Sequence, residues 1–355
     1  MNRGQVMKVV YDEAQKKHYP GFFLTSGARA PNPERPERAD ILFEASLRAG
    51  LVHEVPPDFG LAPAAAIHTP EYLEFLTNIH ARWQHIALAS DEVIPNIHPD
   101  RRGGAYPLSA VGQAGYHMAD TSCPIGPQTF ASALRSSHAA TQAAVRVNEG
   151  AAAAYALCRP PGHHAFGDLA GGFCYLNNSA IAAQTLRERT PRVAILDVDL
   201  HHGNGTQGVF YGRADVLTVS IHADPVRFYP FFWGHADERG EGAGRGYNLN
   251  LPLERHTGDE GFLAALDRAL SRIQAFAPGA LVVALGLDAY EGDPFGGLSV
   301  STPGFARIGG LIGQLGLPSV IVQEGGYICD ALGDNLVAFM EGFRASHAVA
   351  GRTGS

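Results

Sequence analysis

Apolar runs of strand length alternate with helical patterns along most of this 355-residue chain. A first strand is expected at 7–12. The helical patterns predict helices at 36–50, 69–83, 129–150, 177–190 and 261–277. Five further runs are apolar almost throughout, as in strands covered on both faces, and with their polar ends they span 153–164, 192–202, 215–224, 280–294 and 318–327. Strands that alternate with helices predict an α/β fold built on a parallel sheet.

The five later runs share a second feature, which is a polar or glycine-rich end. In chain order these ends read RPPGHH, DVDLHHGNG, SIHAD, GLDAYEGDP and EGGY. In open α/β sheets, ligands bind in the crevice at the carboxyl ends of the strands. The five polar ends therefore predict one crevice in which their side chains meet.

The composition narrows the class of protein. A hydrophobic content of 45% and a charged content of 17% fit a folded globule, and a formal net charge of -8 argues against broad nucleic-acid binding. The four cysteines form no CxxC pair, so a zinc finger is not expected.

No run is long enough to span a membrane and no signal peptide is recognisable, so we expect a cytoplasmic protein. Without repeats or linkers, 1–355 is expected to form one domain, with its core at about 7–345.

The stretch AILDVDLHHGNG carries the densest chemistry. Because side chains alternate along a strand, Asp199 and His201 are expected to point to the same side while Leu200 points away. Asp288, at the end of another run, can add a second carboxylate. One imidazole and two carboxylates suit a divalent metal such as zinc and leave a position open for water. The alternatives are a buried ion pair for the first two residues and a helix cap or turn role for Asp288.

Three further patterns are candidates for the same site. His163 and His164 follow a rigid Pro-Pro-Gly turn and could act as a general acid–base pair beside a metal-bound water. Tyr327 follows two glycines and could donate a hydrogen bond to a developing oxyanion. Phe173, in GGFCY, could form a tunnel wall. The ordinary alternatives are surface histidines, a surface loop tyrosine and a core phenylalanine, but all these patterns lie at the strand ends of one predicted sheet.

The motifs RPPGHH, DVDLHHGNGT, VSIHAD, GLDAYEGDP and EGGY, in this order, resemble the zinc-dependent histone deacetylase superfamily. The similarity is greatest to its bacterial branch of acetylpolyamine amidohydrolases and histone deacetylase-like amidohydrolases, and it covers most of the chain, from the first strand to NLVAFMEGF. The resemblance implies the arginase/deacetylase α/β fold, with a central, mostly parallel sheet of about eight strands flanked by helices. It also implies a zinc-dependent amidohydrolase that removes acetyl groups from acetylpolyamines or N-acetyl-lysine and releases acetate.

The resemblance assigns a role to each candidate residue. It implies zinc, or Fe²⁺, held by Asp199, His201 and Asp288. The active-site groups it implies are the histidine pair His163 and His164, the carbonyl-polarising Tyr327, the histidine partners Asp197 and Asn204, the substrate-tunnel residues Gly172, Phe173 and Tyr229, and Arg38 of an internal acetate channel. One or two potassium ions are implied as well, one held by Asp197, Asp199, His201, Ser220 and Ile221, the other by Phe210, Arg213, Val216 and Tyr247.

The family mechanism would divide the work between these groups. It implies that both histidines help to remove the proton of the attacking water and that Tyr327 and the metal hold the tetrahedral oxyanion. His164 would then protonate the leaving amine. Many deacetylases carry a carboxylate where this chain has Asn204, and an amide cannot stabilise an imidazolium as Asp197 can. We therefore predict that His164 is less basic than His163.

The substrate is less well determined by the resemblance. Polyamine-cleaving relatives carry acidic residues before the long helix, and this chain offers Asp120 there, but it has Val111 and Ser122 at positions that are acidic in those relatives. The segment 78–109 resembles the loop through which such relatives pair, which suggests a homodimer or a higher homo-oligomer.

Two other functions remain open. An arginase-like dimetal ureohydrolase shares the fold, but it needs further aspartates where this chain has Gly203 and Tyr290. A non-catalytic protein that binds acylated amines would not need Tyr327 and both histidines, which are all present. Neither a nucleic-acid partner nor a membrane is expected.

Overall fold

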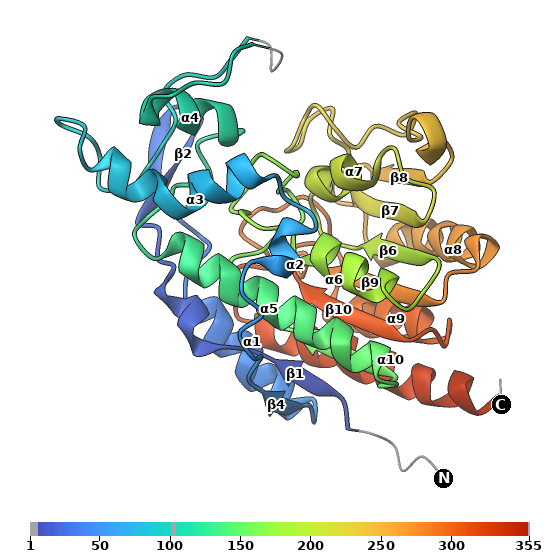
Figure 1. The fold of residues 1–355 in the computed structure, drawn as a ribbon. Coiled ribbons are helices and arrows are strands. Elements are labelled where there is room, and N and C mark those ends of the chain that lie inside the picture. Colours follow the sequence, from blue (N-terminus) through green and yellow to red (C-terminus); the bar gives the residue numbers. More distant parts are fainter. Residues whose placement is uncertain (1–5, 101–103, 354–355) are drawn as a thin grey trace.

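The computed structural model describes residues 6–100 and 104–353, so the chain's first five residues and part of the segment 78–109 lie outside the described residues (Figure 1). At its centre is an eight-stranded sheet in which every neighbouring pair of strands is parallel. Across the sheet the order is β4 (Val52–Glu54), β1 (Lys8–Val10), β5 (Ala153–Ala156), β10 (Ser319–Gln323), β9 (Ala280–Leu285), β6 (Val193–Asp197), β7 (Val216–Ala223) and β8 (Asn248–Leu253). The predicted parallel α/β sheet is confirmed.

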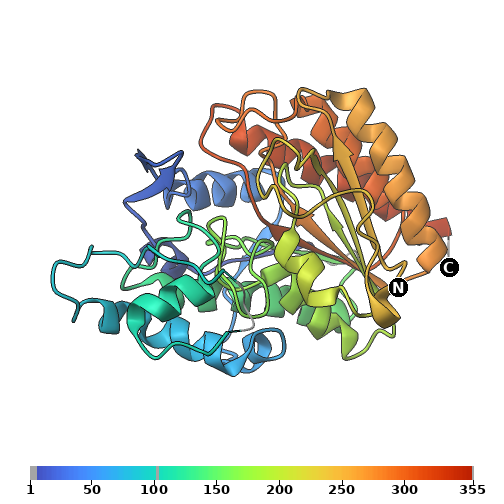
Figure 2. The same cartoon turned by 90° about the horizontal axis from the view of Figure 1, so that it is seen from above.

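Helices cover both faces of this sheet, as Figure 2 shows from above. One face packs against α1 (Glu37–Arg48), α8 (Asp259–Phe276), α9 (Thr302–Gly313) and α10 (Leu332–Thr353), and the other against α5 (Thr129–Asn148) and α6 (Asn178–Arg187). Because side chains alternate along a strand, Ala194 and Leu196 of β6 enter the first core cluster while Val193 and Ile195 enter the second. Burial on both faces explains why the central strands are apolar throughout.

The remaining elements lie around this three-layer core. They are the helices α2 (Ala62–Ala65), α3 (Pro70–Trp83), α4 (Ala110–His117) and α7 (Asn204–Phe210), the 3₁₀ turns η1 (Glu13–Lys17) and η2 (Gly242–Gly244), and the antiparallel hairpin of β2 (Phe22–Thr25) and β3 (Ala28–Pro31). Helix α3 begins as its sequence predicts, with the Thr69 hydroxyl accepting the N–H of Tyr72 and Pro70 in the first turn. No helix among the described residues is both long and apolar enough to cross a membrane.

All six strands and five helices expected from the sequence pattern are present. The pattern did not predict the edge strands β4 and β8, because β4 has only three residues and β8 reads NLNLPL, with two asparagines and a proline. It also missed α9, whose sequence holds several glycines, poor helix formers. There the glycines permit close packing on α10, since a Cβ on Gly309 would lie 2.2 Å from the carbonyl oxygen of Phe339.

Candidate active site

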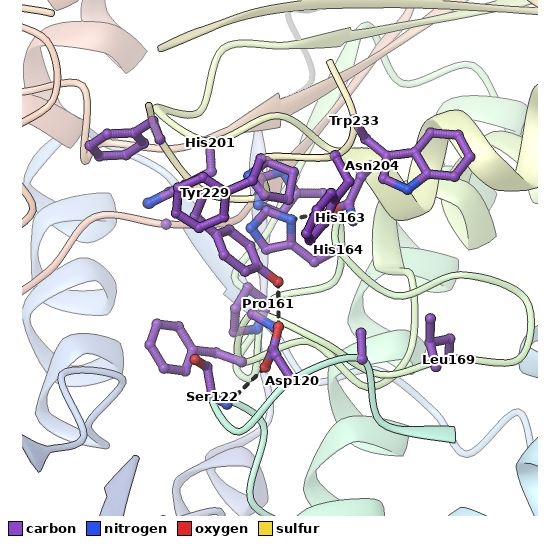
Figure 3. Close-up of a pocket in the computed structure, with 18 of the residues that line it drawn as sticks. Asp120, Ser122, Pro161, His163, His164, Leu169, His201, Asn204, Tyr229 and Trp233 are labelled. Carbon is purple, nitrogen blue, oxygen red and sulfur yellow. Dashed lines mark hydrogen bonds between the residues drawn. The ribbon is translucent and has the colours of Figure 1, made fainter. Parts of the chain in front are cut away.

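A cavity of about 1030 Å³ opens at the carboxyl ends of the central strands (Figure 3). Its wall combines side chains from all five loops that follow the apolar runs, and the β2–β3 hairpin adds a further side. Residues that line it include Phe23, Asp120, His163, His164, Gly172, Phe173, Asp199, His201, Asn204, Phe228, Tyr229, Phe295 and Tyr327. Polar groups far apart in the sequence are therefore brought into one crevice.

The loops after β6 and β9 build a compact cluster of Asp199, His201 and Asp288. The Nδ1 atom of His201 lies 3.2 Å from Oδ1 of Asp199 and 3.1 Å from Oδ2 of Asp288, and all three residues are buried. The other oxygen of each carboxylate is fixed by a backbone N–H, since Gly325 donates to Asp199 at 2.7 Å and Leu200 donates to Asp288 at 3.0 Å. The cluster is thus held in place by the protein itself.

The chemistry of this cluster fits a divalent metal ion. A single nitrogen, Nδ1 of His201, faces two carboxylate oxygens, and one N–H cannot serve both well. Burial lowers the pKa of His201, but the hydrogen bonds and charges of Asp199 and Asp288 outweigh it and raise this pKa to about 9. The site therefore favours positive charge. Zinc ligands held at 2.0–2.2 Å in a tetrahedron lie roughly 3.3–3.6 Å apart, close to the spacing seen here.

The geometry of the turn differs from the strand alternation that the sequence suggested. Strand β6 ends at Asp197, so Asp199 and His201 lie in the turn beyond it. They still converge, because the N–H of Asp199 donates to Asp197 at 3.1 Å and the N–H of His201 donates to Asp199 at 2.8 Å. Leu200 points away into the core, as expected. Glycine is required opposite the turn, because a Cβ on Gly325 would lie 2.3 Å from Oδ2 of Asp288.

The adjacent histidines form a pair beside this cluster. A turn closed by the N–H of Ala165 lets both rings face the cavity, with their centroids 4.0 Å apart. Nδ1 of His163 lies 2.9 Å from Asp197, and Nδ1 of His164 lies 2.7 Å from Asn204. With only 2% and 4% of their surfaces exposed, they are not surface histidines. Both residues line the cavity, and neither Nε2 atom makes a hydrogen bond to a described residue.

The different partners of the two rings shift their pKa values in opposite directions. Burial lowers the pKa of His163, but the charges of Asp199 and Asp197 outweigh it and raise this pKa to about 10. For His164, burial and then the neighbouring His163 hold the pKa well below its usual range. An amide partner such as Asn204 offers no charge to offset this effect.

We predict that His163 and His164 titrate separately, with His164 losing its proton at the lower pH. Replacing Asn204 by aspartate places a carboxylate beside Nδ1 of His164, so it should raise the pKa of that ring and bring the two titrations closer together. Nitrogen-15 NMR titration of the imidazoles, in the protein as isolated and in Asn204→Asp, measures both values. Equal pKa values in the unmodified protein would contradict this account.

Tyr327 lines the same cavity as the two histidines. Its surface is 3% exposed, so it is not a surface loop residue, and its ring lies 4.7 Å from that of Phe295 and 6.0 Å from that of Phe173. The hydroxyl makes no hydrogen bond to any residue that the structure describes. It is therefore available to a ligand in the cavity.

The tunnel residues expected from the sequence, Gly172, Phe173 and Tyr229, all line the cavity, and Figure 3 shows Tyr229 beside Asp120. The Tyr229 hydroxyl donates to Oδ2 of Asp120 at 2.6 Å, and the N–H of Gly172 donates to the same oxygen at 3.1 Å. Phe173 has a left-handed backbone, with φ of 68°. A Cβ on Gly172 would lie 2.4 Å from the ring of His164, so only glycine fits there. Asp120 thus places a carboxylate in the cavity wall.

Sequence reasoning missed two buried acids that organise these loops. Glu324 accepts the N–H groups of Gly162 and His163 at 2.7 and 3.0 Å and the hydroxyl of Ser179 at 2.7 Å, and burial raises its pKa to about 7. Asp293 holds the backbone of Tyr327. An acid directly after a buried strand, as in QEGGY, was the only available signal for Glu324.

The remaining candidate residues are those of the expected potassium sites and acetate channel, and their positions do not test these roles. Asp197 and Ser220 are paired on neighbouring strands, and both line a small cavity of about 10 Å³. The carbonyl oxygens of Phe210 and Tyr247 each accept a backbone hydrogen bond. Arg38 is buried and stacks over the ring of Tyr327 at 4.9 Å. The potassium sites and the acetate channel stay predictions.

The comparisons with known proteins define the class. The family described as "Histone deacetylase domain" matches residues 32–343, and the chain therefore belongs to the histone deacetylase family. It is 48% identical to the acetylpolyamine amidohydrolase of Burkholderia pseudomallei (strain 1710b) over 343 residues, which cover 96% of this chain and 99% of that protein. It is 44% identical to acetylpolyamine amidohydrolase 1 of Pseudomonas aeruginosa PAO1 over 346 residues, covering 96% and 99% of the two chains.

The solved structures agree with this assignment. The crystal structure of the Burkholderia pseudomallei acetylpolyamine aminohydrolase superposes with a TM-score of 0.94 at 48% identity, over 96% of this chain and 99% of that one. The HD domain of HDA15 superposes with a TM-score of 0.78 at 26% identity, over 96% and 90% of the two chains. The expected arginase/deacetylase fold is confirmed.

Proposed function

We propose that this protein is a metal-dependent deacetylase that hydrolyses N-acetylated polyamines and releases acetate. Membership of the histone deacetylase family makes the chain a hydrolytic deacetylase, and the proposal concerns its metal, its residues and its substrate. The observation that carries it is the cluster of Asp199, His201 and Asp288, because its first two members line the same cavity as the histidine pair and Tyr327.

Asp199, His201 and Asp288 would hold the metal, with zinc as the first candidate and Fe²⁺ as the second. When bound, such an ion acts as a Lewis acid that polarises a carbonyl and lowers the pKa of a water ligand. In this proposal the histidine pair removes one proton from the attacking water. His164, which is unprotonated near neutral pH, accepts that proton, while His163, which is protonated beside Asp197, assists by donating a hydrogen bond to the water. Tyr327 donates its hydroxyl proton in a hydrogen bond to the oxyanion. His164, the less basic ring, gives up a proton readily and protonates the leaving amine.

The polyamine substrate is proposed from two observations. Two relatives that are 48% and 44% identical to this chain, and that align over nearly their whole length, are named acetylpolyamine amidohydrolases. In this chain the cavity wall carries the carboxylate of Asp120, which suits a substrate with a second, positively charged amine. Val111 and Ser122 supply no further acidic group. Recognition of the charged amine would therefore depend more on Asp120 here than on any one residue in relatives with several acidic groups.

Comparing substrates by kcat/KM tests this choice. We expect N-acetylputrescine and N-acetylspermidine to be hydrolysed more efficiently than an acetyl-lysine peptide or the uncharged N-butylacetamide. Asp120→Asn removes the charge and can keep its oxygen as the acceptor for Tyr229 and Gly172, although its amide group then faces the N–H of Ser122, which donates to Asp120 at 2.7 Å. It should lower kcat/KM for the cationic substrates about fivefold, as for the loss of a charge pair worth about 1 kcal/mol, and leave N-butylacetamide unaffected. A higher kcat/KM for the acetyl-lysine peptide would contradict the proposed substrate and indicate a protein deacetylase.

Two further properties concern the domain organisation and the assembly of the protein. We propose that residues 1–355 form one domain, because all eight central strands share one sheet. We also propose a homodimer or higher homo-oligomer formed through the segment 78–109, where Leu88, Ile97 and Leu108 are exposed. The arginase-like reaction is not favoured, because Gly203 and Tyr290 supply no carboxylate for a second metal.

A further inference from the structure

The loop that carries Tyr327 is tied down along its backbone. Within residues 324–327, the N–H of Gly325 donates to Asp199 at 2.7 Å, and Arg38 donates to two carbonyl groups, including that of Gly326 at 2.6 Å. Buried backbone groups need such partners, and glycine-rich segments have no side chains of their own to fix their course. The backbone N–H of Tyr327 itself is held by a residue to which the mechanism above gives no role.

That residue is Asp293, which is only 6% exposed. Its Oδ2 accepts the backbone N–H of Tyr327 at 2.9 Å, and its Oδ1 accepts the backbone N–H of Phe295, also at 2.9 Å. The rings of Tyr327 and Phe295 pack against each other with their centroids 4.7 Å apart. One carboxylate therefore fixes the backbone of both aromatic residues where they face the cavity.

The two loops joined by Asp293 have different duties. One follows β9 and contains Asp288, a proposed metal ligand, and the other follows the neighbouring strand β10 and contains Tyr327. We propose that Asp293 is a positioning residue that sets the Tyr327 hydroxyl relative to the metal cluster. The inference rests on the proposed function, since it requires Tyr327 to act on the substrate carbonyl.

The cost of losing this tie follows from the backbone around it. Gly326 precedes Tyr327 with φ of 108°, a conformation that glycine leaves readily. Among the described residues, Asp293 alone accepts the N–H of Tyr327. A displacement of about 1 Å at a catalytic group can lower the rate about 100-fold. Asp293→Ala removes both hydrogen bonds, and Asp293→Asn retains an acceptor for only one.

The test measures Asp293→Ala and Asp293→Asn in two backgrounds, the unmodified protein and Tyr327→Phe. In the unmodified protein we expect kcat to fall about 10- to 100-fold, with KM and the bound metal nearly unchanged. In the Tyr327→Phe background the same substitutions should lower the remaining rate less than about threefold, because the group they position is already gone. Because variants in the Tyr327→Phe background are slow, their rates are measured as acetate release under single-turnover conditions.

Asp259→Ala is the matched control. That carboxylate also holds another loop, accepting the N–H and the hydroxyl of Ser301 at 2.8 and 2.6 Å, but it does not line the cavity. It should leave kcat within about twofold in both backgrounds. An equal loss in both backgrounds, or an unchanged kcat in either Asp293 variant, would overturn the proposal for Asp293. Retained activity in Tyr327→Phe alone would instead overturn the role of Tyr327 itself. If the alanine variant does not fold, the asparagine variant decides.

Discussion

Tyr327→Phe is expected to lower kcat about 100- to 1000-fold, the usual cost of removing one oxyanion donor. The substitution deletes only the hydroxyl, and the ring keeps its packing against Phe295 and Phe173. Because the hydroxyl bonds no described residue, its loss leaves no buried group unpaired and stability should not change. Steady-state kinetics on an acetylated polyamine, with the melting temperature as the check on folding, measure the effect.

Tyr290→Phe is the control for this prediction. Tyr290 lies on the neighbouring loop after β9 but does not line the cavity, so removing its hydroxyl should leave kcat near the unmodified value. A Tyr327→Phe protein with undiminished turnover would show that another group holds the oxyanion. The proposed mechanism would then lose its main electrostatic contribution from the protein.

Asp288→Asn is expected to remove the metal and nearly all activity. The change keeps the shape of the side chain and the acceptor for the N–H of Leu200, but it removes one of the two negative charges that face His201. Losing an outer partner of a metal ligand typically costs 10- to 100-fold in affinity or activity, and losing a ligand should cost more. Metal content by mass spectrometry and acetate release should fall together.

Asp330→Asn serves as the comparison here, because Asp330 is exposed and lies just beyond Tyr327 in the same loop region. It should keep both metal and activity. An Asp288→Asn protein that binds a full equivalent of metal and turns over normally would remove Asp288 from the ligand set and leave only two of the three proposed ligands.

The sequence carried much of the fold because the central strands are buried on both faces. Runs such as the one ending at Asp197 are almost entirely apolar. When helical patterns separate such runs, they predict parallel strands that are buried on both faces. The chemistry was visible for a related reason. Polar residues such as His201 and Asp288 directly follow strands, and parallel strands bring their carboxyl ends to one edge.

Other features depend on contacts between distant segments and left no local signal. Asp293 lies in a turn-like EGDP sequence, and only the neighbouring loop reveals that it holds the N–H of Tyr327. The β2–β3 hairpin brings Phe23 to within 5.6 Å of Phe173, although 150 residues separate the two rings. The edge strands β4 and β8 are too short or too polar for periodicity to distinguish them from loops.

The central claim is that one divalent metal, held by Asp199, His201 and Asp288, makes this chain a deacetylase. The most direct measurement is metal content per chain together with acetate release from N-acetylputrescine, before chelation, after it, and after Zn²⁺ is returned. The account predicts about one metal ion per chain, loss of acetate release on chelation, and recovery in proportion to the metal restored. A metal-free protein that releases acetate at the full rate, or a metal-loaded protein inert toward every acetylated amine, would contradict it.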